Sequence, residues 1–254
     1  MAIKIEAGLM PAYSANSRWY HDMSDSVKQI MRHLHTVKTI QEIAEKSHML
    51  KTIQDVQAWQ CQRLLISHQD MYQQVRFKSA VEFFVDELYG PKDFSQRDQD
   101  IARLVPKMAK LLPEKALVSL ASALHLNALS LELDFEMARN LQEKPVNRES
   151  YALAYFECNN QTSRQRQIDY IQTLGRDLAD VVKMKGISLL LKLSRKPAKL
   201  AGVLALHEFL EAGFKAFKNL GDVNDFVNPV VAREQYILTQ LFDPTAPNPL
   251  PMNI

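Results

Sequence analysis

Histidine and carboxylate side chains at helical spacing are the residues of this chain whose types could support chemistry. His125, Glu132 and Glu136 are separated by seven and four residues, which places them along one side of a helix. His207 and Glu211 form a second pair, four residues apart, in an apolar region. If the two helices face each other, these side chains could hold a metal ion or act as a general acid and base. The candidate metal ligands are His125, Glu132, Glu136 and His207. The alternative, which we favour, is that each histidine is a hydrogen-bonded residue beside an acid.

Other sequence patterns that carry chemistry are incomplete. A carboxylate-bridged metal site in a helical bundle needs two Glu-x-x-His pairs, and the chain has one, from Glu45 to His48. It contains no glycine-rich phosphate-binding pattern of the GxxxxGK[ST] or GxGxxG kind. Cys61 and Cys158 form no CxxC pair, so we expect buried or half-buried thiols. The sequence therefore predicts no cofactor.

The chain changes direction at an aromatic and charged joint between residues 83 and 98. Gly90 and Pro91 stop the preceding helix, and we expect Gly90 in the left-handed conformation that closes helices. Ser95, with Asp98 three residues later, predicts a capping box that opens the next helix. Aromatic rings and an arginine could clasp the two helices together, and the alternative is a surface for a partner. The joint residues are Phe83, Phe84, Tyr89, Gly90, Pro91, Asp93, Phe94, Arg97 and Asp98.

The joint resembles the Phe-Phe-x-x-(Asp/Glu)-Leu-Tyr-Gly-Pro-x-Asp-Phe-x-x-Arg-Asp signature of an uncharacterised family of all-helical bacterial proteins. The likeness extends over most of residues 55–235. The resemblance implies an all-helical fold and a bacterial cytoplasmic setting. It carries no catalytic residue to any position of this chain.

Positive charge is concentrated between residues 183 and 218. This segment contains eight basic and two acidic residues, a local charge of +6, whereas the whole chain carries +2. Apolar residues interleave with the bases, so the segment could lie on an anionic membrane surface. The alternative, which we favour, is that the apolar residues form the bundle core or a homodimer interface while the lysines face solvent. The candidate basic surface comprises Lys183, Lys185, Lys192, Arg195, Lys196 and Lys199.

Helical periodicity runs through most of the chain and must position these side chains. Apolar residues recur at three- and four-residue intervals from Val27 to Ile43 and again through residues 53–88. The longest pattern runs from Glu114 to about Gln142, and we expect this helix at the centre of the fold. Seven glycines in 254 residues fit helices joined by short connections. The sequence predicts an all-α, single bundle-like domain of about eight or nine helices.

Prolines and capping residues predict several helix boundaries. Pro106 should kink or break the helix that follows the joint, and Pro197 should break the apolar C-terminal region. Asn147 can start a short helix. Thr162 with Gln165 predicts another capping box.

The predicted organisation is an N-terminal extension over residues 1–21, a helical domain over 22–242 and a proline-rich tail over 243–254 that is loose or lies across a groove. The N-terminus lacks the apolar core of a signal peptide, so we expect a cytoplasmic protein, peripheral to the inner membrane if segment 183–218 binds lipid. The leading functional prediction is a non-enzymatic interaction or regulatory protein that binds a protein partner or a second copy of itself. The alternatives are a helical metalloenzyme and a peripheral membrane protein. Nucleic acid is not an expected partner, because the overall charge is nearly neutral.

Overall fold

The computed structural model describes residues 24–109, 112–142 and 144–254, so the extension over residues 1–21 lies outside the described part. The described residues are all-α and contain no strand, as predicted. They form ten helices of seven residues or more, against the eight or nine expected. In chain order the elements are α2 (Asp25–Lys46), α3 (Leu50–Ser67), α4 (Gln69–Tyr72), α5 (Val75–Phe84), the π-helical turn η1 (Val85–Tyr89), α6 (Ser95–Met108), α7 (Glu114–Leu141), α8 (Arg148–Glu157), α9 (Gln161–Val181), α10 (Ile187–Leu200), α11 (Leu204–Lys218) and α12 (Asn224–Leu241).

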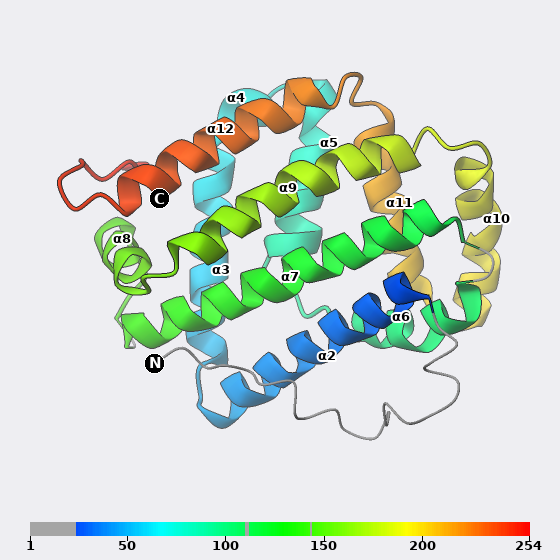
Figure 1. Ribbon diagram of the computed structural model, residues 1–254, viewed down its shortest axis with the longest axis horizontal. Helices are drawn as coiled ribbons and strands as arrows, with labels where there is room; N and C mark the ends of the chain where they lie inside the picture. The colour runs from blue at the N-terminus through cyan, green and yellow to red at the C-terminus, as the bar shows by residue number, and fades with distance from the viewer. Residues whose placement is uncertain (1–23, 110–111, 143) are drawn as a thin grey trace.

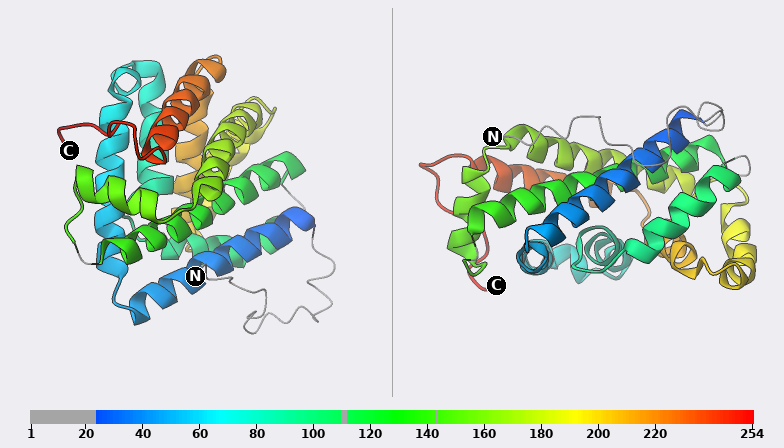
Figure 2. Two further views of the ribbon diagram at one scale, coloured as in Figure 1. Left: turned by 60° about the vertical axis from the view of Figure 1, so that its left-hand side comes forward. Right: turned by 90° about the horizontal axis from the view of Figure 1, so that it is seen from below.

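Two layers of helices cross each other in this fold (Figure 1). In one layer α2, α7, α9 and α12 run side by side in that spatial order. In the other layer α3, α5 and α11 cross behind them (Figure 2). α8 and α10 lie at opposite ends of the molecule. Side chains from both layers therefore meet in the interior.

α7 occupies the centre of the fold, as its length and apolar pattern predicted. It packs between α2 and α9 and also contacts α3 and α8. The predicted stripe is buried at Leu117, Leu124 and Phe135, and Leu126 and Leu133 on other sides of the helix are buried as well. By length and composition alone α7 could cross a membrane, but 61% of its apolar window is buried inside the protein. Packing against several neighbours thus accounts for its apolar character.

The joint turns by a mechanism that differs from the prediction. Gly90 follows η1 with φ −66° and ψ 159°, an extended conformation rather than the predicted left-handed one. A Cβ atom at Gly90 would lie 2.8 Å from the backbone oxygen of Val85, so glycine is needed for close approach. The capping box at Ser95 is also wrong. In a capping box the Ser95 N–H would donate to the Asp98 side chain. It donates instead to Oδ1 of Asp93, two residues earlier, at 2.9 Å.

Substituting Gly90 with alanine is expected to lower the free energy of unfolding by about 1–3 kcal/mol, because the added methyl group must displace backbone. Urea denaturation followed by circular dichroism measures the change. Lys92→Ala in the same loop is the control, since Lys92 is exposed and its ion pair with Glu87 contributes little. Equal unfolding midpoints for Gly90→Ala and the wild type would contradict the close approach.

The break expected near Pro197 lies a few residues after it, between α10 and α11, and Pro197 itself stays within α10. The helix continues through Pro197 to Leu200, and the chain breaks at Gly202, where φ is +67°. Pro106 lies within α6, which ends at Met108. Glycine with a positive φ therefore ends α10, as glycine commonly does after a helix.

The start of α8 follows the prediction and the start of α9 does not. Asn147 Oδ1 accepts hydrogen bonds from the N–H groups of Glu149 and Ser150, which caps α8. α9 begins at Gln161 after Asn160, so the capping box predicted at Thr162 and Gln165 is absent there. The Asn160 amide instead donates to Glu136 Oε2 on α7, at 2.5 Å.

The proline-rich tail packs against α8. Arg148 donates from Nε to the backbone oxygen of Leu250 at 2.9 Å and from Nη2 to that of Asn248 at 2.7 Å. The Leu250 side chain is buried against Tyr151 and other residues of one apolar cluster. The tail therefore covers part of the interior rather than hanging free.

Candidate functional site

The four candidate metal ligands do not converge. The His125 ring stacks on His33 of α2, with 4.3 Å between ring centroids. His207 is buried beside α10, where its Nε2 donates to the backbone oxygen of Leu191 at 2.8 Å. Within the described ranges, no group of three or more histidine, cysteine, aspartate or glutamate side chains is arranged to hold a metal ion. The hypothesis of a metal site therefore does not hold for these residues, because His125 and His207 lie in different surroundings.

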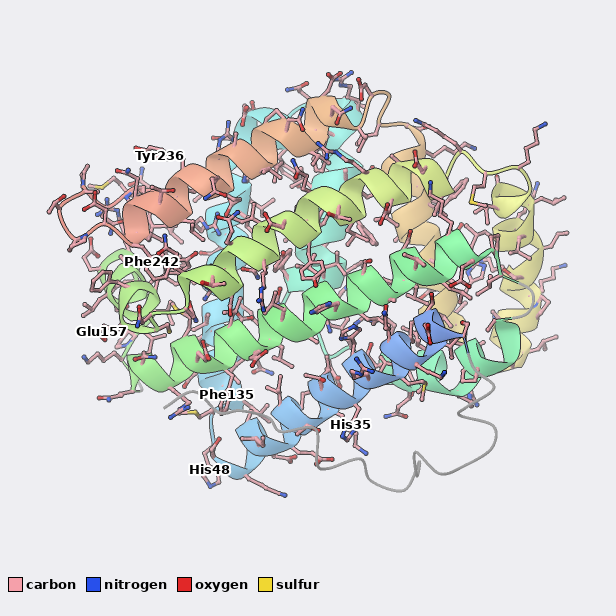
Figure 3. All side chains as sticks on the ribbon, viewed as in Figure 1. His35, His48, Phe135, Glu157, Tyr236 and Phe242 are labelled. Atoms are coloured by element: carbon pink, nitrogen blue, oxygen red, sulfur yellow. The ribbon has the colours of Figure 1, made fainter. Side chains whose placement is uncertain are left out.

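The acidic candidates on α7 have ordinary structural surroundings. Burial and the charge of Glu136 raise the pKa of Glu132. Burial lowers the pKa of His125, so this ring favours its neutral form. His48, from the single Glu-x-x-His pair, lies exposed at the turn after α2 (Figure 3).

The joint is an internal clasp with one exposed edge. Arg97 donates from Nη1 to the backbone oxygen of Glu87 at 2.8 Å and from Nε to Asp98 Oδ1 at 2.9 Å. Its guanidinium group lies over the rings of Phe94 and Phe209. Phe83, Phe84, Tyr89, Gly90 and Arg97 are buried, Phe94 and Asp98 are half-buried, and Pro91 and Asp93 are exposed. Most of the joint is therefore structural, and residues 91–93 form a continuous exposed edge.

The candidate basic surface is exposed at all six of its residues. α10 carries four of them and has no buried residue. The expectation that the apolar residues of this region enter the core is right for α11, which buries Leu206, Phe209 and Phe217. It is wrong for α10, which contacts little besides α11.

A central cavity of about 90 Å³ brings together polar side chains that sequence spacing did not connect. It is bordered by α3, α5, η1, α8, α9, α12 and the tail. Its polar lining residues are Gln60, Arg63, His68, Tyr89, Tyr151, Tyr155, Arg164, Gln167 and Glu234. Aliphatic and phenylalanine side chains form the remaining walls. Of the nine polar residues, Tyr89 had been assigned to the joint, and the sequence connected none of the others to it.

Arg63 and Glu234 form a buried ion pair in the cavity wall. Arg63 Nη1 lies 2.6 and 2.7 Å from the two carboxylate oxygens of Glu234. Burial raises the pKa of Glu234, but the charge of Arg63 and the hydrogen bonds from His68 and Arg63 outweigh it and hold the pKa at about 2. Glu234 is therefore a carboxylate at neutral pH and balances the charge of Arg63.

His68 is held between this ion pair and Arg233. Its Nε2 lies 2.8 Å from Glu234 Oε1, and its Nδ1 lies 3.3 Å from Arg233 Nη1. Because an arginine can only donate, Nδ1 accepts and Nε2 carries the proton. Both ring nitrogens of His68 are thus engaged in fixed contacts.

Arg164 has two buried nitrogens without a partner, whereas Arg63 has one, its Nε. Its guanidinium group lies 4.6 Å from the centre of the Tyr155 ring, and its Nη1 donates to Gln167 Oε1 at 3.3 Å. Arg164 is only 4% exposed, yet no described residue bonds its Nε or Nη2. These two groups share the edge of the guanidinium that binds carboxylates and phosphates in bidentate fashion. A fixed, buried and unfilled fork therefore borders the cavity.

Asp134 is a buried acid near Arg164 that does not fill that fork. Its two oxygens accept hydrogen bonds from Gln60 Nε2 at 2.9 Å and Gln57 Nε2 at 3.1 Å. Burial raises the pKa of Asp134, and the charge of Arg164 opposes this increase. Arg164 thus acts on Asp134 through space, while the two glutamines donate to the oxygens of Asp134.

Tyr89 borders both the cavity and a larger outer cleft. The cleft has a volume of about 980 Å³ and lies between α2, α3, α7 and the joint. The Tyr89 hydroxyl is buried and interacts with Ser130, but no described residue completes a hydrogen bond to it in good geometry. Burial raises its pKa, so the hydroxyl stays protonated at neutral pH and can donate. A second donor, engaged at most weakly by Ser130, thus lines the same cavity as Arg164.

The unfilled donors determine what the cavity can do chemically. A buried polar group without a partner costs about 1–3 kcal/mol. Besides Arg164 and Tyr89, the Nε of Arg63 also lacks a partner among the residues described. Water molecules or a ligand that offers acceptor oxygens would remove this cost. The arrangement is therefore suited to binding an acceptor-bearing molecule.

The sequence contained a signal for this site. Arg164 shares one face of α9 with Ile168 and Ile171, four and seven residues later. Glu234 shares one face of α12 with Val230 and Ile237. A charge on an apolar stripe is unusual, because charged groups are rarely buried unless they have a partner.

A family model matches most of this chain. A model described as a domain of unknown function (DUF8198) matches residues 39–248. This range contains every residue that lines the cavity except Leu250. No curated protein and no solved structure matches the chain.

Proposed function

We propose that this chain, which belongs to the family described as a domain of unknown function (DUF8198), is a non-enzymatic binding protein that holds a short monocarboxylate in its central cavity. The observation that carries the proposal is the fork of Arg164, whose Nε and Nη2 are buried without partners among the described residues. The ring of Tyr155 and the side chain of Gln167 hold the guanidinium in place, so little freedom is lost when a ligand binds.

The charges around the cavity favour a ligand with a single negative charge. Glu234 and Asp134 already place two carboxyl groups near the two arginines. A doubly charged anion would be repelled by the Glu234 carboxylate, whereas a single carboxylate needs only the one free fork. The apolar walls, which include Ile168 and Val230, would contact a short hydrocarbon tail.

The size of the cavity limits the ligand to a few heavy atoms. Its volume of about 90 Å³ is smaller than the roughly 150 Å³ of an engineered apolar cavity that holds benzene. Acetate, propionate and butyrate bracket this size. We place the carboxylate on Arg164, the Tyr89 hydroxyl beside it and the tail against the aliphatic walls.

The protonation states of the three lining tyrosines and of Glu234 support binding rather than catalysis by these groups. A general acid or base works best with a pKa near the operating pH. Burial raises the pKa of Tyr89, Tyr151 and Tyr155, and the surroundings of Glu234 lower its pKa to about 2. These groups therefore keep one protonation state near pH 7.

Thermal unfolding of the full chain in different sodium salts tests this proposal. We expect formate, acetate, propionate or butyrate to raise the melting temperature in a saturable way, and phosphate at equal ionic strength to raise it less. A ligand at 100 times its dissociation constant should stabilise the protein by about 2.7 kcal/mol. Equal melting temperatures in all salts would show that water alone fills the cavity and would refute the proposal.

A further inference from the structure

α10 displays leucines on a stripe that faces solvent. Leu189 and Leu193 are 59% and 66% exposed, and Leu200 is 91% exposed. At about 100° per residue, the three leucines fall within about 40° of one another around the helix. Single exposed apolar residues are normal on soluble proteins, whereas an aligned set marks an interaction site.

The opposite face of α10 fixes this stripe in its outward position. Leu191 and Ser194 are half-buried on the side that meets α11. The buried His207 of α11 donates to the backbone oxygen of Leu191 at 2.8 Å, and Arg195 pairs with Glu211 of α11 at 2.6 Å. The helix is therefore anchored by one face, and the leucine stripe on the other face has no neighbour among the described helices.

Lysines flank the leucine stripe and give it a charge preference. Lys192, Lys196 and Lys199 are exposed on the adjacent sector of α10. The sequence has no acidic residue from Val181 to His207. α10 also lies at one end of the molecule, where it can reach a flat surface (Figure 1). An amphipathic helix with exposed leucines and flanking lysines is typical of helices that lie in the interface of an anionic membrane.

We infer that α10 docks this protein onto an anionic phospholipid surface, with the leucine stripe inserted among the acyl chains and the lysines at the headgroups. A second copy of the chain suits this face less well. A two-fold interface brings the same patch against itself, so the lysines would meet their copies without nearby acids. An anionic lipid surface supplies the missing negative charge.

Flotation of the full chain with vesicles of phosphatidylcholine, with or without phosphatidylglycerol, tests this inference. We expect binding only when phosphatidylglycerol is present, and weaker binding as salt is added. Lys192→Gln with Lys196→Gln should lower the partition coefficient roughly 25-fold, at about fivefold for each lysine. Leu189→Ser with Leu193→Ser should abolish binding, because the leucine stripe makes the apolar contacts with the acyl chains. Lys144→Gln, at an exposed lysine beyond the far end of α7, is the control and should change nothing.

Several results would overturn the inference. Absence of binding to phosphatidylglycerol vesicles at low salt would do so. Sedimentation equilibrium that shows a dimer dissociated by Leu189→Ser with Leu193→Ser, without any vesicle binding, would assign the face to a second copy instead. Arg164→Lys should leave vesicle binding unchanged, because Arg164 lies in the central cavity and not on α10. The two proposals therefore fail or succeed separately.

Discussion

Replacing Glu234 with alanine is expected to lower the free energy of unfolding by about 3–5 kcal/mol. The substitution leaves Arg63 without its counter-ion. Arg63 is buried, and its Nη1 donates to the two oxygens of Glu234 at 2.6 and 2.7 Å. An uncompensated buried charge is among the largest penalties that a single substitution can cause. Thermal unfolding should show the midpoint falling by roughly 6–20 °C for a chain of this length.

Two controls separate charge from packing in that experiment. Glu208→Ala removes an exposed acid from α11 and should leave the midpoint unchanged. Arg63→Met with Glu234→Leu removes both charges together and should be closer to the wild type than Glu234→Ala. A Glu234→Ala protein within about 1 kcal/mol of the wild type would contradict the buried ion pair.

The pH dependence of stability should report the same ion pair. The pKa of Glu234 is lowered from 4.5 to about 2, chiefly because the charge of Arg63 outweighs the effect of burial. A group with a lowered folded pKa contributes stability that is fully present above its ordinary pKa and is lost as the pH falls through the folded value. The free energy of unfolding of the wild type should therefore fall relative to that of the double variant as the pH drops from about 4.5 to about 2.

Arg164→Lys is expected to weaken the binding of a short monocarboxylate by about 10–100-fold. Lysine keeps the positive charge but offers a point charge instead of the planar fork of Nε and Nη2. Isothermal titration calorimetry with acetate, propionate and butyrate measures the change in dissociation constant. The larger loss should appear for the carboxylate that the wild type binds best.

Two further variants test whether the loss of affinity in Arg164→Lys comes from the fork itself. Arg166→Lys makes the same substitution at an exposed position two residues along α9 and should leave affinity unchanged. Tyr89→Phe removes one unfilled hydroxyl with little change in volume, so it should weaken binding less than Arg164→Lys. Equal affinities for Arg164→Lys and the wild type would show that the fork does not hold the ligand.

Helices with a repeating apolar pattern could be predicted from the sequence. Local conformations that depend on one tertiary contact could not be predicted. The long stripe that contains Leu117 and Leu124 correctly placed α7 at the centre. Gly90 was assigned the wrong conformation because its role depends on the approach to the backbone oxygen of Val85, which follows from the π-helical turn before it. Ser95 lost its capping role because Asp93 competes for the same N–H group.

The cavity could not be predicted because its partners come from distant parts of the sequence. Arg63 and Glu234 are 171 residues apart, so no local spacing connects them. The metal-site hypothesis relied on spacing within α7, which sets His125 and Glu132 on one helix but says nothing of where His207 lies. The position of Arg164 on an apolar stripe was the one available sign of a buried charge.

The structure of the basic segment, residues 183–218, could also be predicted only in part. The sequence identified its lysines, but it could not distinguish a leucine that packs in the core from one that faces solvent. That difference depends on the number of neighbouring helices, since α11 contacts α5, α6 and α9 as well as α10, whereas α10 meets chiefly α11.

A crystal structure of the full chain grown in propionate tests the central claim most directly. We predict planar density in the cavity, with the two carboxylate oxygens about 2.7–2.9 Å from Nε and Nη2 of Arg164. The hydrocarbon tail should contact the wall that includes Ile168 and Val230. Separate water peaks at the Arg164 fork, with propionate bound elsewhere or nowhere, would contradict the claim that this cavity holds a short carboxylate.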